Sequence, residues 1–410
     1  MSIHQPLRCH TLGLWLLFAV VLSWPFILHQ VWGMDVGFGD VHLYRAWALD
    51  GVDHGRWPVL DYDWIYPIGA LAPIAALAPL ASSPLYESVF VTSIYLADAV
   101  IMMLLRDRLG ARAAAWWLCF LLFLGPVAES RLDGIAVVLA TAALLVIANR
   151  PRIATVLVTS AAWVKVAHGA WMLPILLGSR RRLRDVIAPA AAFTLGVALI
   201  SFALGGERRL FSFVGGQSDR SLQIESVAAT PFDILHMLGR PSGLFGNREL
   251  HAWEFIGPTA RQIAQFLDIA MLLAVICVGI LTFLAARRDR IPAYELLLLS
   301  ITATTLAMIT FNKVGSAQYI LWLSSPLAAS FALRSGADSV WRPARLLALV
   351  AAAATQLLYP VGYFSLLHGD VWAVGSLIVR NAALVTLLVL VSRALWRAGR
   401  PAPVEVRVRR

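Results

Sequence analysis

Residues 11–32 read TLGLWLLFAVVLSWPFILHQVW and contain no Asp, Glu, Lys or Arg. A helix of about 20 apolar residues crosses the hydrocarbon core of a bilayer, so this stretch predicts a membrane-spanning helix. It is longer than the core of a secretion signal, and no small-residue cleavage site follows it. We therefore expect a retained first span.

Similar apolar runs recur along the rest of the chain and predict further spans. They lie near residues 86–105, 113–128, 134–149, 186–205, 264–286, 293–311, 318–333, 346–362 and 374–394. With their loops, the 410 residues suit an all-α polytopic integral membrane protein. We expect one bundle of about ten to thirteen transmembrane helices with extracytoplasmic juxtamembrane loops.

Two further apolar runs are irregular. Ile65–Ala81 contains three prolines, which predicts a broken segment at the outer surface rather than a clean span. Ile153–Leu177 is interrupted at its middle by Lys165 and His168. We expect it to form two short helices that meet near the outer face.

The composition excludes most other classes of protein. Hydrophobic residues make up 59% of the chain and charged residues 14%, with a mean hydropathy of +0.73, whereas a soluble domain is about 45–50% apolar and roughly a quarter charged. The sequence has no internal repeat, soluble domain or nucleotide-binding glycine motif. We expect one transmembrane domain over 1–400, with outer loops at 33–85 and 206–263, and a basic cytoplasmic tail at 401–410.

The net charge of +10 follows from topology, so no nucleic-acid partner is expected. The predicted cytoplasmic loops and tail carry 22 Arg against six acidic residues, whereas the rest of the chain has 12 basic residues and 18 acidic ones, two of them within spans. Cytoplasmic loops of membrane proteins are enriched in Arg and Lys. The bias predicts a multi-pass cell-membrane protein with both termini in the cytoplasm and any chemistry on the outer face.

The first outer loop contains the most unusual stretch, MDVGFGDVHLYRAWALDGVDHGRWPVLDYDWIYPIGA (34–70). Its six aspartates are interleaved with Trp and Tyr, and carboxylates beside aromatic faces suit sugar binding. Asp40 lies a few residues past the first span, where the membrane edge would partly desolvate it and make it a usable general base. Asp35, Asp50, Asp53 and Asp61 are better explained as solvated charges or helix caps.

Only two of the 34 basic residues are lysines, and both Lys165 and Lys313 lie at the outer ends of apolar segments. A compact ammonium at the membrane boundary suits a lipid phosphate. An ionisable residue inside an apolar segment is costly unless it is paired, so it indicates function by default. The alternative is that the two side chains snorkel toward lipid head groups.

Other polar residues near the predicted outer face are harder to assign. Glu129, Arg131 and Asp133 share a very short turn, where lining a site and capping helices are equally good explanations. His168 would assist phosphate binding, although a lone histidine near a helix break is more often a packing residue. Arg380 would contact a phosphate or pair with an intramembrane aspartate, and the sequence does not choose between them. The large outer loop is expected to cover the site.

Together these residues resemble the GT-C membrane glycosyltransferases and, among them, glycosyltransferase family 87. The matching pieces are Gly39-Asp40-Val41-His42-Leu43-Tyr44, Tyr66-Pro67, Lys165 in a broken segment, and Lys313-Val314-Gly315-Ser316-Ala317-Gln318-Tyr319. The sequence departs from the family at Ile68, His168 and Ala317, where proline is common. It also has Leu132-Asp133-Gly134 in place of the common Gly-Gln-Asn pattern.

The resemblance implies a GT-C fold and a transferase that moves a sugar, with mannose as the first candidate. The donor would be a polyprenyl-phosphate sugar, and the acceptor a lipid or glycan on the extracytoplasmic face. Asp40 would be the catalytic base of an inverting single displacement. The donor phosphate would be held by Lys165, Lys313, Arg131 and His168. Substrate contacts would come from His42, Tyr44, Arg45, Tyr66, Asp133, Gln318 and Tyr319.

No cofactor is expected, because protein cations that neutralise a phosphate leaving group let transfer proceed without a nucleotide. No metal ligands are assigned, and the sequence leaves a divalent metal open. The rival interpretation is a transporter or lipid flippase of the cell envelope, whose charged residues would line a path. Against it, the polar residues cluster at one face instead of near the bilayer midplane. A scaffold for envelope assembly is a further alternative.

Overall fold

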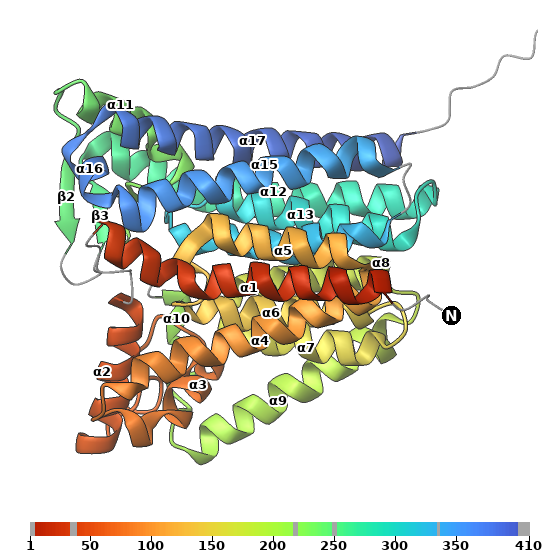
Figure 1. The fold of residues 1–410 in the computed structure, drawn as a ribbon, viewed down its shortest axis with the longest axis horizontal. Coiled ribbons are helices and arrows are strands. Elements are labelled where there is room, and N and C mark those ends of the chain that lie inside the picture. The colour runs from red at the N-terminus through yellow and green to blue at the C-terminus, as the bar shows by residue number, and fades with distance from the viewer. Residues whose placement is uncertain (1–4, 33–38, 216–219, 248–251, 334–336, 401–410) are drawn as a thin grey trace, which may run out of the picture.

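The computed structural model describes residues 5–32, 39–215, 220–247, 252–333 and 337–400. The basic tail 401–410 and Asp35 lie outside these ranges. Long helices run side by side along the longest axis of the molecule (Figure 1). Helix α1 begins and α17 ends at the same end of the bundle, which we call the termini end. The opposite end, where α2, α3, α11, α16 and the strands lie, is the loop end.

Seven helical segments among the described residues are long and apolar enough to cross a membrane, so the predicted polytopic fold is confirmed. The spans are formed by α1 (Gln5–Trp32), α4 (Leu85–Leu109), α9 (Ala188–Ala203) with the preceding turn η5 (Leu183–Ile187), α12 (Pro258–Arg288), α13 (Ala293–Thr310), α15 (Asp338–Gln356) with the following turn η10 (Leu357–Val361), and α17 (Val371–Gly399).

The remaining predicted spans and the broken run at 153–177 form shorter helices packed inside the bundle. They are α5 (Ala111–Leu124), α6 (Leu132–Val146), α7 (Pro151–Val164), η4 (Val166–Trp171) with α8 (Met172–Gly178), and η7 (Ala317–Leu323) with α14 (Ser324–Ala329) and η8 (Ser330–Ala332). The chain breaks at Lys165 as expected, because its backbone is extended, with φ −140° and ψ 108°. The proline-rich run after Ile65 forms three short helices and no span: η1 (Ile68–Ala70), α3 (Leu71–Ala76) and η2 (Ala78–Leu80).

The loop end is built from short elements. They comprise α2 (Gly39–His54), α10 (Ser212–Gly215), η6 (Val227–Ala229), α11 (Thr230–Met237), α16 (Tyr363–His368) and three strands, β1 (Leu222–Gln223), β2 (Leu244–Asn247) and β3 (Ala252–Phe255). The strands form one antiparallel sheet in the order β1-β3-β2, with Leu222 opposite Phe255 and Gly246 opposite Trp253. A small apolar core that includes Phe255 and Leu222 joins this sheet to α17.

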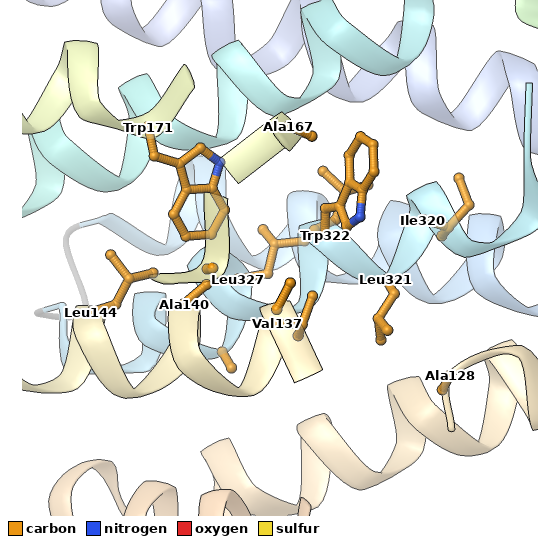
Figure 2. Packing of buried hydrophobic residues seen from close by; sticks show 14 of the residues in the cluster. Ala128, Val137, Ala140, Leu144, Ala167, Trp171, Ile320, Leu321, Trp322 and Leu327 are labelled. Carbon is orange, nitrogen blue, oxygen red and sulfur yellow. The ribbon is translucent and has the colours of Figure 1, made fainter. Parts of the chain in front are cut away.

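The main core lies along α6. Val137, Ala140 and Leu144 recur every three or four residues, so they share one face of this helix. Figure 2 shows this face turned toward Trp171 of η4 and Trp322 of η7. All five are almost fully buried. This packing fixes the first turn of α6 and the break at Lys165 relative to each other, and both contribute to the site.

Candidate active site

A cavity of about 670 Å³ opens at the loop end of the bundle. Segments far apart in the sequence line it: α2 and the loop after it, the turn before α6, the break at Lys165, the chain around β1 and β3, the turn before η7, and the break before α16. The lining residues include Asp40, Leu43, Trp47, Tyr62, Asp63, Trp64, Tyr66, Arg131, Lys165, Arg220, Gln223, Glu225, Trp253, Ser316, Gln318, Tyr319, Tyr359 and Tyr363.

Four of these residues have extended backbones at points where helices stop. Arg131 precedes α6 (φ −131°, ψ 149°), Lys165 precedes η4 (φ −140°, ψ 108°) and Ser316 precedes η7 (φ −152°, ψ 141°). Tyr359 interrupts the end of α15 (φ −142°, ψ 121°). Backbone that leaves a helix within a membrane protein must be satisfied by other protein groups or by a wet cavity. These breaks therefore mark where the bundle opens.

Asp40 and Arg131 form one ion pair at the cavity wall. Asp40 is in the first turn of α2, where a carboxylate is favoured by the helix dipole. Its Oδ2 lies 3.0 Å from Nε of Arg131, and a terminal nitrogen of the guanidinium donates a 3.0 Å hydrogen bond to the hydroxyl of Tyr359. The Arg131 side chain is 6% exposed and that of Asp40 is 32% exposed. The Asp40 carboxylate is thus accessible from the cavity, while the Arg131 guanidinium is buried and held by Tyr359.

Lys165 and Asp133 form a second, more buried pair. Nζ of Lys165 lies 3.1 Å from Oδ2 of Asp133, whose Oδ1 accepts a 2.7 Å hydrogen bond from Nε1 of Trp322. The ammonium also lies 4.7 Å from the ring centre of Tyr66 and 5.9 Å from that of Tyr319. Cations are attracted to such ring faces. Asp133 and the two rings therefore aim the ammonium at the cavity.

Arg220 differs from the other cavity cations. Its Nε is buried without a hydrogen-bond partner, and among the described residues no carboxylate pairs with it. A buried guanidinium donor is costly to leave unsatisfied. Its position on the cavity wall makes it a cation that, among the residues described, only an anionic ligand would neutralise.

A second carboxylate, Glu225, faces the cavity from the loop after β1. Its Oε2 lies 2.9 Å from Arg380 of α17, and Arg380 also donates to the backbone carbonyl of Glu225. Burial raises the pKa of the Glu225 carboxyl, although Arg380 opposes the shift. For Arg380 we expected a phosphate contact or an intramembrane aspartate partner. The structure instead pairs it with Glu225.

Aromatic side chains cover much of the remaining wall. Trp47, Trp64 and Tyr66 pack edge to face, with ring centres 5.1 Å apart for the two tryptophans. Burial raises the pKa of Tyr66 to about 12, although Lys165 opposes the shift, so its phenol stays protonated and can donate a hydrogen bond at neutral pH. Flat apolar rings with polar edges, next to carboxylates, fit the C–H faces and hydroxyls of a sugar.

The structure brings half of the predicted site residues to the cavity. These are Asp40, Tyr66, Arg131, Lys165, Gln318 and Tyr319. Asp133 does not line the cavity but forms the ion pair with Lys165. Tyr44 is buried, and its hydroxyl accepts a 3.3 Å hydrogen bond from the backbone N–H of Leu132, so it supports the turn that carries Arg131.

His42 and Arg45 do not reach the cavity. Nδ1 of His42 lies 2.7 Å from Oε1 of Glu87, and Arg45 donates to the carbonyl of Ala81 at 2.8 Å, beside the same glutamate. Both side chains project from α2 toward α4 and the turn before it. They hold α2 against the bundle, and the structure does not place them on the cavity wall, so their substrate contacts stay a prediction.

Lys313 and His168 are also not among the cavity residues. Nζ of Lys313 lies 2.8 Å from Oδ2 of Asp268 on α12. His168 is 1% exposed, packs between Trp171 and Trp322, and has no hydrogen-bond partner for its ring among the described residues. Both side chains are buried. The geometry therefore does not support the expected phosphate contacts.

Several cavity residues were not singled out from the sequence. Tyr359 falls at the end of the predicted span 346–362 and Tyr363 directly after it, where the Tyr359-Pro360 dipeptide was the available signal of a break. Arg220 and Glu225 belong to the large outer loop, whose residues could not be ranked without the fold; 216–219 of that loop lie outside the described residues. Within the described residues, no group of three His, Cys, Asp or Glu side chains is placed to hold a metal ion.

Comparison with known proteins gives one match. Residues 64–311 match the family model of Glycosyltransferase family 87. The matched region contains Tyr66, Arg131, Lys165, Arg220 and Glu225 of the cavity, whereas the first part of the cavity wall, including the α2 carboxylate, precedes it. No curated protein and no solved structure matches the chain.

Proposed function

The chain belongs to glycosyltransferase family 87 and is a membrane glycosyltransferase, and from this premise we propose that its donor is a polyprenyl-phosphate sugar, with mannose as the sugar. The acceptor is a lipid or a glycan. The observation that carries this proposal is the cavity at the loop end, where the accessible carboxylate of Asp40 lies 3.0 Å from Arg131 and shares the cavity wall with the cations Lys165 and Arg220.

The three cations suit the phosphate of the donor. A phosphate ester that leaves from the anomeric carbon carries its negative charge away, and fixed cations stabilise that developing charge. Arg131 and Arg220 can each offer two N–H groups to phosphate oxygens, whereas Lys165 acts as a point charge. Arg220 takes the place that the sequence suggested for Lys313, because it faces the cavity and has no carboxylate partner among the described residues.

The reaction is a single displacement. Asp40 takes the proton of the acceptor hydroxyl while that oxygen bonds to the anomeric carbon, and the bond from this carbon to the phosphate oxygen breaks. The anomeric configuration inverts. Arg131 can contact both Asp40 and the donor phosphate. When its guanidinium donates hydrogen bonds to the phosphate, the ion pair with Asp40 weakens, and the Asp40 carboxylate becomes a better base.

The extracytoplasmic face is the proposed side of the reaction. The cavity lies at the loop end, whereas the Arg-rich connections lie at the termini end, which the positive-inside rule places in the cytoplasm. An apolar bundle around the cavity also suits a donor delivered within the bilayer. The aromatic wall, including Trp47, Trp64 and Tyr66, would hold the sugar ring.

The test is transfer of radiolabelled mannose from polyprenyl-phosphate mannose to membrane lipid extract by the purified protein. Asp40→Asn keeps the size of the side chain but removes the base, so we expect transfer to fall by roughly 100-fold or more. The matched control is Asp53→Asn, an exposed aspartate of the same helix outside the cavity, which should transfer normally. Near-normal turnover by Asp40→Asn would remove the base from the mechanism, and uptake of donor into vesicles without product would indicate a transporter.

A further inference from the structure

A second cavity, of about 290 Å³, lies at the termini end between α15 and α17. It is separate from the site at the loop end and shares no residue with it. We call it the α15–α17 groove. Its principal lining residues are Val340, Val389, Leu390, Arg393, Ala394 and Arg397.

The groove combines an apolar floor with a cationic rim. Val389 and Leu390 provide an aliphatic surface, while Arg393 and Arg397 stand one helical turn apart on α17. Both arginines are exposed, and neither pairs with an acidic side chain among the described residues. The nearest acid on α15, Asp338, lies 3.1 Å from Arg345 and is therefore already engaged. Within the described part of the chain, the rim therefore carries positive charge that no acidic side chain neutralises.

The length of α17 places this rim at the level of lipid head groups. The helix has 29 residues and is about 44 Å long, whereas the hydrocarbon core of a bilayer is about 30 Å thick. Arg393 and Arg397 lie about 33 and 39 Å from its first residue, so a core that starts at the first turn of the helix ends just before them. Trp396, which is 48% exposed and stacks with Arg400, occupies the same level, as aromatic residues at a membrane interface do.

We propose that the α15–α17 groove binds one anionic phospholipid of the leaflet at the termini end. The phosphodiester accepts hydrogen bonds from Arg393 and Arg397, and the upper part of an acyl chain lies along Val389 and Leu390. Basic pockets between transmembrane helices are suited to anionic head groups, because charge and apolar surface meet at one depth. A neutral zwitterionic lipid matches the floor equally well but gains less from the rim.

Native mass spectrometry of the full chain in detergent measures this binding. The protein is mixed with equal amounts of phosphatidylglycerol and phosphatidylcholine, and retained lipids are counted. We expect one phosphatidylglycerol retained per chain in preference to phosphatidylcholine. Arg393→Gln/Arg397→Gln should lower its retention roughly ten-fold or more. Arg287→Gln/Arg288→Gln, which removes two exposed arginines from the same end outside the groove, should leave retention unchanged.

A third variant separates a shaped site from a general charge effect. Ala394→Phe fills the groove and keeps both arginines, so a groove-bound lipid should be lost and a purely electrostatic contact should persist. Equal losses in the two double arginine variants, unchanged retention in Ala394→Phe, or equal retention of the two lipids by the unaltered protein would each overturn the proposal. Far-ultraviolet circular dichroism of every variant verifies that the bundle is folded.

Discussion

At the level of single residues, the site depends on which cations are already neutralised. Lys165 is aimed into the cavity by Asp133, and Arg131 is shared between Asp40 and Tyr359. Such pairs keep buried charges in place at moderate cost, because each ion retains a partner after it leaves water. Arg220 has no such partner among the described residues, so a phosphate gives it the most new interaction.

Arg220→Gln should therefore weaken binding of the donor and leave binding of the acceptor unchanged. Loss of charge-assisted hydrogen bonds to phosphate is expected to raise the donor KM roughly ten- to hundred-fold. Lys313→Gln is the matched control, since Lys313 contacts Asp268 and does not line the cavity; its donor KM should be unchanged even where stability falls. Initial rates at varied donor concentration measure both. A large rise for Lys313→Gln alone would restore Lys313 as the phosphate ligand.

At the level of elements, the cavity is assembled where helices break and chain segments meet closely. The turn before η7 lies directly against the loop after β1: a Cβ at Gly315 would overlap the backbone of Glu225 and Ser226. Gln223 N–H also donates a 3.0 Å hydrogen bond to the carbonyl of Lys313. This approach sets the position of Glu225 on the cavity wall, with Arg380 behind it.

Gly315→Ala should consequently disturb the cavity wall, although it adds only one methyl group. The added methyl forces two backbone segments apart, so we expect lower thermal stability and at least a ten-fold loss of transfer, roughly the effect of misplacing a reacting group. Gly375→Ala on α17 is the control, because no atom lies near its added Cβ. Melting temperature and transfer rate are compared for both variants. An unchanged melting temperature and transfer rate in Gly315→Ala would show that the two backbone segments can move apart at little cost.

Helix α11 carries a buried carboxylate that should make stability depend on pH. Burial raises the pKa of Asp233 from 3.8 to about 8, with Arg380 opposing and Glu225 adding to the shift. The folded state then holds a proton that the unfolded state releases, so stability falls as pH rises from about 4 to about 8. Asp233→Asn should flatten this decline in melting temperature. A decline equally steep in the variant would assign the dependence to other groups.

At the level of the whole molecule, the two ends have different chemistry. The loop end carries the acidic first loop and the cavity that contains Asp40, and the termini end carries the Arg-rich connections and the α15–α17 groove. A bundle with this asymmetry is oriented by its charges during insertion. The proposed reaction therefore depends on the orientation as well as on the site.

Cysteine labelling in intact cells tests the orientation. In a background with the three native cysteines replaced, Asp53→Cys at the loop end should react with a membrane-impermeant maleimide. Asp289→Cys, exposed in the connection after α12 at the termini end, should react only after the cells are permeabilised. The opposite pattern would place the cavity in the cytoplasm and exclude the proposed extracytoplasmic reaction.

Much of the architecture could be predicted from the sequence, because apolar length is a local property. The run at 11–32, the break at Lys165 and the proline-rich segment after Ile65 each appear as expected, since the bilayer and proline act on short stretches of chain. Asp40 was identified by its place after the first span and by the family motif, and the structure brings it to the cavity. Its role as the base remains a prediction.

By itself the sequence determined the polytopic fold, the charge bias between loops and the small set of ionisable residues near one face. Only the tertiary structure decided how those ions pair: Lys313 with Asp268, Arg380 with Glu225, and Arg131 with Asp40. The reason is that spans are selected by the local free energy of burying apolar side chains, whereas Coulomb and hydrogen-bond energies depend on distances between segments. Glu225 and Arg380 are 155 positions apart in the chain, and only the packing of the loop end on α17 brings them to 2.9 Å.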